Sequence, residues 1–135
     1  MPNAAKDRLR VVIADDSDRM REVMVRLLGA VFEVVAAVAT GRDLVKATLD
    51  LKPDVVVSDI SMPRLTGPGA LQQLRRAGHD VPFVLVAAEV LNAQGWLGFG
   101  ADAVVDKRDL QAELVAAVDA VADGEIYISR HATGD

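Results

Sequence analysis

The chain has 135 residues, of which 51% are hydrophobic, and this matches one globular domain with a substantial core. Asp and Glu number 20 against 15 Lys and Arg, and the net charge of −5 disfavours direct binding to nucleic acid or to an anionic membrane. Cysteine is absent, which excludes disulfides and thiolate metal sites, and no apolar run approaches the ~20 residues of a membrane span. We therefore expect a soluble domain, located in the cytoplasm.

Strands and helices are expected to alternate along the chain. Short apolar runs predict strands, and apolar residues repeated every three or four positions predict helices. The expected strands cover residues 9–14, 32–39, 54–59, 81–88 and 103–106. The expected helices cover residues 18–28, 44–51, 68–77, 90–99 and 110–123. Apolar strands that alternate with helices predict an α/β domain, in which a parallel sheet is covered by helices on both faces.

Acidic residues follow two of the expected strands. Asp15 and Asp16 end the first strand, Asp59 ends the third, and Lys107 follows the fifth. In open α/β sheets, ligands bind outside the carboxyl ends of the strands. Three carboxylates and one lysine at this edge suit a hard cation such as Mg²⁺ together with an anion. Taken singly, each residue has a plainer interpretation, because the acids could cap a helix or form a turn and the lysine could lie on the surface.

These residues resemble the receiver domain of bacterial two-component response regulators over about Leu9 to Ile128. The shared motifs are Asp15-Asp16, Asp59 followed by Met62-Pro63 and Gly67, and Gly100-Ala101-Asp102 leading to Lys107. The tail from Leu114 to Ser129 is similar to receivers of the NarL/FixJ subfamily, in which this segment leads into a linker and a helix-turn-helix DNA-binding domain.

The resemblance implies a (βα)5 doubly wound fold of the flavodoxin-like and CheY-like kind, with five parallel strands in the order 2-1-3-4-5. It divides the chain into a disordered N-terminal tail (residues 1–8), a receiver domain (9–124) and the start of a linker toward an output domain (125–135).

The resemblance also implies a role for each site residue. Asp59 would accept a phosphoryl group from the phosphohistidine of a sensor histidine kinase. Asp16 and Asp59 would hold Mg²⁺ directly, together with the backbone carbonyl of Ser61, and Asp15 would act through water. Lys107 would pair with Asp59 and then with the phosphoryl oxygens. A carboxylate that attacks phosphorus passes through a negatively charged, in-line transition state, so positioning and cations contribute most of the catalysis.

Two positions depart from the family pattern. Ala87 stands where receivers usually carry Ser or Thr, and Ser and Thr are absent from Val81 to Gly100. Val104 stands where the second switch residue is commonly aromatic. Loss of one neutral hydrogen bond to the phosphoryl group costs ~1 kcal/mol, which is about fivefold in a population ratio. We therefore expect intact phosphorylation chemistry and an atypical switch.

Two further positions lie where relatives tune the lifetime of the phosphoryl group. These positions are Ser61 and Glu89, which lie two residues beyond the phosphoacceptor and the missing hydroxyl respectively. Glu89 adds negative charge near the site, so we expect it to slow attack by water or to hinder access.

The main hypothesis is a phosphorylation-controlled regulatory domain of a transcription factor. We expect the protein to have no enzymatic activity beyond self-phosphorylation from phosphodonors and autodephosphorylation. The expected partners are a sensor histidine kinase and a second copy, bound through the first and fifth helices. DNA would be bound only through an output domain, and no membrane would be bound.

Other functions remain open at this stage. The chain could be an atypical receiver that acts as a dimerisation or protein-interaction module without phosphate, which Ala87 and Val104 favour. It could also be a Mg²⁺-dependent phosphatase of the haloacid dehalogenase type. That family needs Thr or Val after its Asp-x-Asp motif, whereas Arg19 follows Asp16-Ser17-Asp18 here. The Gly-rich motifs of nucleotide-binding proteins are absent.

Overall fold

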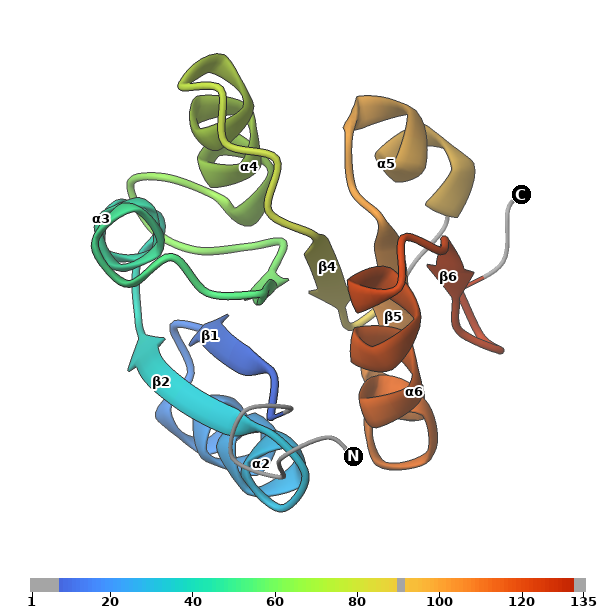
Figure 1. Cartoon of the computed structure of the whole chain (residues 1–135). Helices are drawn as coiled ribbons and strands as arrows, with labels where there is room; N and C mark the ends of the chain where they lie inside the picture. Colours follow the sequence, from blue (N-terminus) through green and yellow to red (C-terminus); the bar gives the residue numbers. More distant parts are fainter. Residues whose placement is uncertain (1–7, 90–91, 133–135) are drawn as a thin grey trace.

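The computed structural model describes residues 8–89 and 92–132. A parallel sheet lies at the centre, with its strands in the order β2-β1-β3-β4-β5-β6 (Figure 1). The strands are β1 (Arg10–Ala14), β2 (Glu33–Val38), β3 (Val55–Asp59), β4 (Phe83–Ala87), β5 (Ala103–Asp106) and β6 (Tyr127–Ile128). The predicted α/β class and the predicted order of the first five strands are confirmed, and β6 is an additional strand that the sequence did not predict.

The helices follow the strands as expected, with small differences at their ends. They are α2 (Asp18–Gly29), α3 (Gly41–Leu51), α4 (Gly67–Arg76), α5 (Ala93–Phe99) and α6 (Leu110–Ala122), with a 3₁₀ turn η1 (Lys107–Asp109) before α6. Helix α3 begins three residues earlier than predicted, because the Thr40 hydroxyl caps it by accepting a hydrogen bond from the backbone N–H of Asp43. The expected tail of residues 1–8 lies outside the described residues except for Arg8, and so do Val90 and Leu91 of the expected helix 90–99.

Successive residues of each inner strand contribute to two different cores. Val11 and Ile13 pack with residues of α2 and α6, whereas Val12 packs with residues of α3 and α4. Side chains alternate between the two faces of a strand, and both faces are covered here, so the strands need apolar residues at every position. This arrangement explains why the strands read as continuous apolar runs in the sequence.

The C-terminal part of the chain turns back onto the domain after α6. Strand β6 runs parallel to β5, with Tyr127 opposite Ala103 and Ile128 opposite Val104. Figure 1 shows β6 beside β5 and α6, where it extends the sheet beyond its predicted fifth strand. Two residues are too few to show a periodic pattern, so this strand could not be recognised from hydrophobic periodicity.

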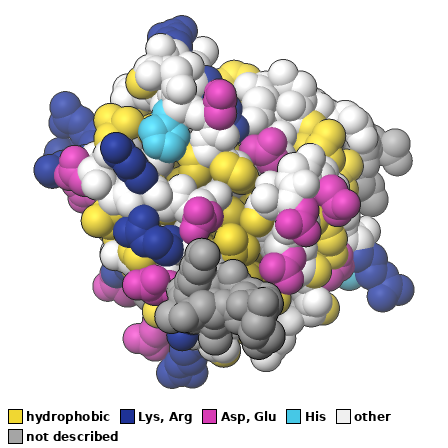
Figure 2. Space-filling view, in the orientation of Figure 1, with side chains coloured by type: hydrophobic (Ala, Val, Ile, Leu, Met, Phe, Trp, Pro, Cys, Tyr) yellow, Lys and Arg dark blue, Asp and Glu magenta, His cyan; other side chains and the backbone are white. Residues whose placement is uncertain are grey.

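Charged side chains of both signs spread over the face drawn in Figure 2, in keeping with the modest net charge of −5. Among the described residues, none of the helices has the length and apolar character needed to cross a membrane.

Candidate functional site

The parallel pairing of β1 with β3 brings the acidic residues together. Ala14 lies opposite Ser58 in the register, so the chain leaves β1 at Asp15 beside the end of β3 at Asp59. Carboxylate oxygens of Asp15, Asp16 and Asp59 all lie within 4.8 Å of one another. Asp15 and Asp59 are buried, whereas Asp16 is exposed to solvent. The structure thus places all three predicted acids in one cluster at the carboxyl edge of the sheet.

Lys107 reaches this cluster from the end of β5. Its Nζ lies 3.4 Å from Oδ1 of Asp59 and 3.7 Å from Oδ2 of Asp15. Strand β5 is separated from β3 by β4, so the lysine must span one strand, and its side chain is largely buried along the way. The ammonium group is therefore held between two carboxylates at the point where an incoming anion would meet Asp59.

Asp59 has an unfavourable environment for its negative charge. Burial is the largest cause that raises its pKa above the ordinary value, and the nearby Asp15 carboxylate adds to this effect. Lys107 acts in the opposite direction, through charge and through a hydrogen bond, but the net pKa shift is upward. A second cation would relieve this repulsion.

One side-chain oxygen of Asp15 accepts no hydrogen bond within the described residues, and its nearest cation is Lys107 at 3.7 Å. The Oδ1 of Asp15 accepts a hydrogen bond of 2.9 Å from the backbone N–H of Ser17. Its Oδ2 is buried and receives no hydrogen bond from any residue in the described part of the chain. Buried carboxylate oxygens normally have a partner, so this oxygen fits a site for a cation or its bound water.

The donor set of the cluster fits Mg²⁺. All its ligand atoms are carboxylate oxygens, which this hard cation prefers. These oxygens lie within 4.8 Å of one another, close to the ~4.2 Å that separates opposite ligands of an octahedral Mg²⁺. Asp15, Asp16, Asp59 and the carbonyl of Ser61 are the groups that would hold the ion.

A pocket of about 510 Å³ opens next to Asp59. Its lining residues come from the ends of β3, β4 and β5 and from α5: Asp59, Ile60, Ser61, Ala87, Ala88, Glu89, Asn92, Trp96 and Lys107. The residues predicted from the sequence that line this pocket are Asp59, Ser61, Ala87, Glu89 and Lys107. Asp15 and Asp16 lie in the acidic cluster with Asp59 but do not line the pocket. Val104 does not line it either, because it is buried in an apolar cluster with Ala87. Asn92 was not predicted, because the expected helix 90–99 included it, whereas α5 begins at Ala93 and Asn92 caps it.

Gly67 holds the other side of the site in place. Its backbone N–H donates to the carbonyl of Ile60 at 3.1 Å, which brings the start of α4 against the end of β3. A Cβ atom at this position would lie 2.2 Å from the carbonyl oxygen of Asp59. Only glycine permits this approach, so the Gly67 of the sequence motif serves the packing of the loop that carries Ser61.

Comparison with known families identifies the same region. Residues 11–119 match the family model described as the response regulator receiver domain. The response regulator GacA of Pseudomonas viridiflava is 34% identical over 90% of this chain and 58% of its own length. A protein-glutamate methylesterase/protein-glutamine glutaminase of Symbiobacterium thermophilum is also 34% identical, and the match covers this whole chain but only 35% of that protein. The chain thus spans between about a third and three fifths of the length of these relatives.

Solved structures of similar fold agree. The signal receiver domain of the response regulator NarL from Mycobacterium tuberculosis superposes with a TM-score of 0.82 at 27% identity, covering 87% of this chain and 98% of that one. A two-component response regulator of the LuxR family from Aurantimonas gives a TM-score of 0.85 at 25% identity, with 93% of each chain covered.

Proposed function

This chain belongs to the response regulator receiver domain family, and we propose that its Asp59 accepts a phosphoryl group from the phosphohistidine of a sensor histidine kinase. The observation that carries the proposal is the position of Asp59. Its carboxylate lies at the mouth of an open pocket, 3.4 Å from the Lys107 ammonium and clustered with Asp15 and Asp16.

The chemistry follows from this arrangement. A carboxylate oxygen of Asp59 forms a bond to phosphorus while the bond from phosphorus to the imidazole nitrogen breaks. Mg²⁺, when held by the acids and the Ser61 carbonyl, neutralises charge on the phosphoryl oxygens. Lys107 already lies beside the Asp59 oxygen, so a small shift lets it pair with a phosphoryl oxygen after transfer. Replacing Lys107 by Ala should leave metal binding possible and weaken the phosphoryl-dependent response.

Incubation with acetyl phosphate and Mg²⁺, followed by intact-protein mass measurement, tests the proposal. We expect one added phosphoryl group in the wild type and none in Asp59→Asn. Asp54→Asn is a matched control, because Asp54 immediately precedes the same strand at the opposite end and should leave labelling unchanged. Absence of label in the wild type, or equal label in Asp59→Asn, would contradict the assignment of the phosphoacceptor.

We propose further that the switch is atypical. Ala87 offers no hydroxyl to the pocket. Val104 is not aromatic and is completely buried, so it cannot rotate between an inward and an outward position as an aromatic switch residue would. The alternative is a module that binds partners independently of phosphate. Oligomeric state measured with and without beryllofluoride, a phosphoryl mimic, separates the two, because a phosphate-independent module would give the same state in both conditions.

Glu89 and Ser61 line the same pocket and are proposed to set the lifetime of the phosphoryl group. The Glu89 carboxylate adds negative charge on the route that an attacking water would take. We expect Glu89→Ala to lose its phosphoryl group several-fold faster than the wild type, by the size of a typical change in local charge. Equal dephosphorylation rates would remove this role.

The output of the signal is proposed to be transcription regulation through a DNA-binding domain outside this chain. Support comes from the name of one relative, the transcriptional regulatory protein PrrA of Mycobacterium bovis, which is 35% identical over 82% of this chain. A dimer through the first and fifth helices, here α2 and α6, is part of the same proposal. These helices pack side by side, and Val23 of α2 leaves an apolar side chain 39% exposed there.

A further inference from the structure

The segment Tyr127–Ala132, which we call the clasp, is fastened along the edge of β5. The N–H of Tyr127 donates to the carbonyl of Asp102 at 3.1 Å, and the N–H of Ser129 donates to that of Val104 at 3.0 Å. The Ser129 hydroxyl then accepts a 2.9 Å hydrogen bond from the N–H of Asp106. The clasp therefore follows β5 to the residue just before Lys107.

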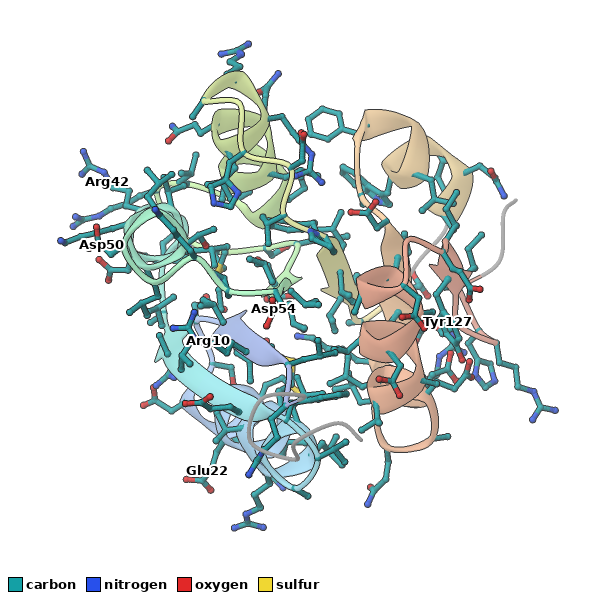
Figure 3. All side chains as sticks on the ribbon, in the orientation of Figure 1. Arg10, Glu22, Arg42, Asp50, Asp54 and Tyr127 are labelled. Atoms are coloured by element: carbon teal, nitrogen blue, oxygen red, sulfur yellow. The ribbon has the colours of Figure 1, made fainter. Side chains whose placement is uncertain are left out.

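Two acidic side chains hold the clasp from the other side. Asp109 is buried and accepts hydrogen bonds from the Ser129 hydroxyl at 2.6 Å and from the N–H of His131 at 2.7 Å, while the His131 ring lies 2.5 Å from its other oxygen. Glu113 accepts from the Tyr127 hydroxyl at 2.8 Å and from the N–H of Arg130 at 3.0 Å. Figure 3 shows Tyr127 beside α6, which carries Glu113. These hydrogen bonds hold the clasp in a defined position against β5 and α6.

The end of the clasp packs on the two atypical switch positions. Ala132 is completely buried in one apolar cluster with Ala87, Ala93 and Val104, and Ile128 packs against the same cluster. A larger aromatic residue at 104 would take up volume in this space. The small side chains at 87 and 104 thus coincide with a surface that accommodates the clasp.

The same cluster borders the phosphorylation pocket. Ala87 and Trp96 both line the pocket, and both also contact the apolar cluster around Ala132. On the other side, the N–H of Asp106 donates to the Ser129 hydroxyl, and Lys107 is the next residue in the chain. Any movement of the pocket wall toward a phosphoryl group on Asp59 therefore alters surfaces on which the clasp rests.

We propose that the clasp is the element that reads the state of Asp59, and that phosphorylation loosens it from β5 and the cluster of Ala87 and Val104. This inference rests on the proposed phosphorylation of Asp59. Closure of the pocket wall and Lys107 onto the phosphoryl group draws Ala87, Trp96 and the end of β5 away from the packing that the clasp requires. The domain then transmits the signal without a hydroxyl at 87 or an aromatic residue at 104.

Coupling of this kind is reciprocal. If a phosphoryl mimic at Asp59 weakens the docking of the clasp, a weakened clasp must strengthen binding of the mimic by the same factor. The structure supplies a reporter for both directions, because Trp96 is the single tryptophan of the chain and contacts both the pocket and the cluster.

Hydrogen exchange with and without beryllofluoride and Mg²⁺ tests the first direction. We expect the amides of Tyr127, Ser129 and His131 to exchange at least about tenfold faster with the mimic, as for opening of a local unit. The opposite edge strand β2 is the internal control and should not change. Asp59→Asn should show no change in the clasp amides.

Ser129→Ala tests the second direction, since it removes the hydrogen bonds of the hydroxyl to Asp106 and Asp109. We expect this variant to bind beryllofluoride at least about fivefold more tightly in a titration of Trp96 fluorescence. Thr48→Ala is the matched control, because Thr48 is a buried hydroxyl in α3 that donates to the carbonyl of Leu44, away from the clasp. Ala132→Gly is a milder second variant that removes only the methyl group in the cluster.

The outcomes separate the two proposals. Phosphorylation of Asp59 by acetyl phosphate with no change in clasp exchange would overturn the clasp proposal and leave the phosphoacceptor function standing. Equal effects of Ser129→Ala and Thr48→Ala on beryllofluoride affinity would also overturn it, because the effect would then be general destabilisation. Failure of Asp59 to take up any phosphoryl group would overturn both.

Discussion

Asp59 and Asp109 are carboxylates that are both buried near the carboxyl edge of the sheet, yet their surroundings differ in kind. Asp59 lies against Asp15 and has Lys107 as its counter-charge, and burial together with Asp15 raises its pKa. Burial also acts to raise the pKa of Asp109, but hydrogen bonds from Ser129 and His131 outweigh it, and the net pKa lies below the ordinary value. Burial is common to both residues, so the hydrogen-bond donors and neighbouring charges decide the direction.

This difference distinguishes a carboxylate that binds a ligand from one that only stabilises the fold. A carboxylate whose donors are all supplied by the protein stabilises the fold and has little capacity left for a ligand. A cluster of carboxylates with too few donors is unstable by itself and gains from a cation or from conversion to an uncharged or metal-bound form. The cluster around Asp59 has too few donors and suits a ligand, whereas Asp109 receives its donors from the clasp and stabilises the fold.

The largest expected effect comes from removing the fully bonded carboxylate. Asp109→Ala should lower the free energy of unfolding by about 3 kcal/mol, because it leaves the donors of Ser129 and His131 without a charged acceptor. Urea unfolding followed by circular dichroism measures this loss. Asp119→Ala, at an exposed position of helix α6, which begins directly after Asp109, should stay within about 0.5 kcal/mol of the wild type. A small loss for Asp109→Ala would mean that the clasp contributes little to stability.

Mg²⁺ should stabilise the protein by binding the acidic cluster around Asp59. Saturation to about 100 times the dissociation constant should raise the free energy of unfolding of the wild type by ~2.7 kcal/mol. Asp15→Asn removes one of two buried like charges, so we expect it to be at least as stable as the wild type in EDTA and to gain much less from Mg²⁺. Thermal unfolding at several Mg²⁺ concentrations gives both values. Equal stabilisation of the two proteins would show that the ion binds elsewhere.

The two carboxylates should also impose opposite pH dependences on stability. The raised pKa of Asp59 means that its contribution is fully present below the ordinary value of 3.8 and is lost as the pH rises through the native pKa. The lowered pKa of Asp109 means that its contribution is present above 3.8 and is lost as the pH falls through the native pKa.

Denaturant unfolding in EDTA between pH 3 and 7 checks these signs. The stability of the wild type relative to Asp59→Asn should fall as the pH rises, with a slope that reaches at most ~1.4 kcal/mol per pH unit. Relative to Asp109→Asn, the stability of the wild type should instead rise with pH at the acidic end of the range. The same sign for both variants would contradict the contrast between the two regions.

The site could be predicted from the sequence more completely than the clasp. Asp15, Asp16, Asp59 and Lys107 could be predicted to meet, because each follows an apolar strand and parallel strands end at a common edge. The clasp depends on contacts between residues far apart in the chain, such as Ser129 and Asp109, and polar residues at such separations carry no periodic signal. The two-residue strand β6 is likewise too short to be predicted, so the expected linker start at 125–135 gave no sign that part of it docks on β5.

The smallest expected effect concerns Tyr127, and it reports the clasp without unfolding the protein. Burial, the hydrogen bond to Glu113 and the charge of that carboxylate raise the pKa of Tyr127 to about 12. Tyr127 is the single tyrosine of the chain, so the absorbance of tyrosinate near 295 nm follows this residue alone. At pH 11 an ordinary tyrosine is roughly nine-tenths ionised, whereas Tyr127 should be ionised only to roughly a tenth.

Glu113→Gln should move this titration toward an ordinary tyrosine, because the amide removes the negative charge beside the hydroxyl while keeping a hydrogen-bonding group in place. Since ionisation occurs more easily in the unfolded chain, the contribution of Tyr127 to stability is present below pH 10 and is lost as the pH rises toward 12. Glu125→Gln, an exposed change next to the clasp, should leave the titration where it is in the wild type. An ordinary titration in the wild type would mean that Tyr127 is not held against α6, and the contrast between a fully bonded clasp and an under-bonded site would then rest on Asp109 alone.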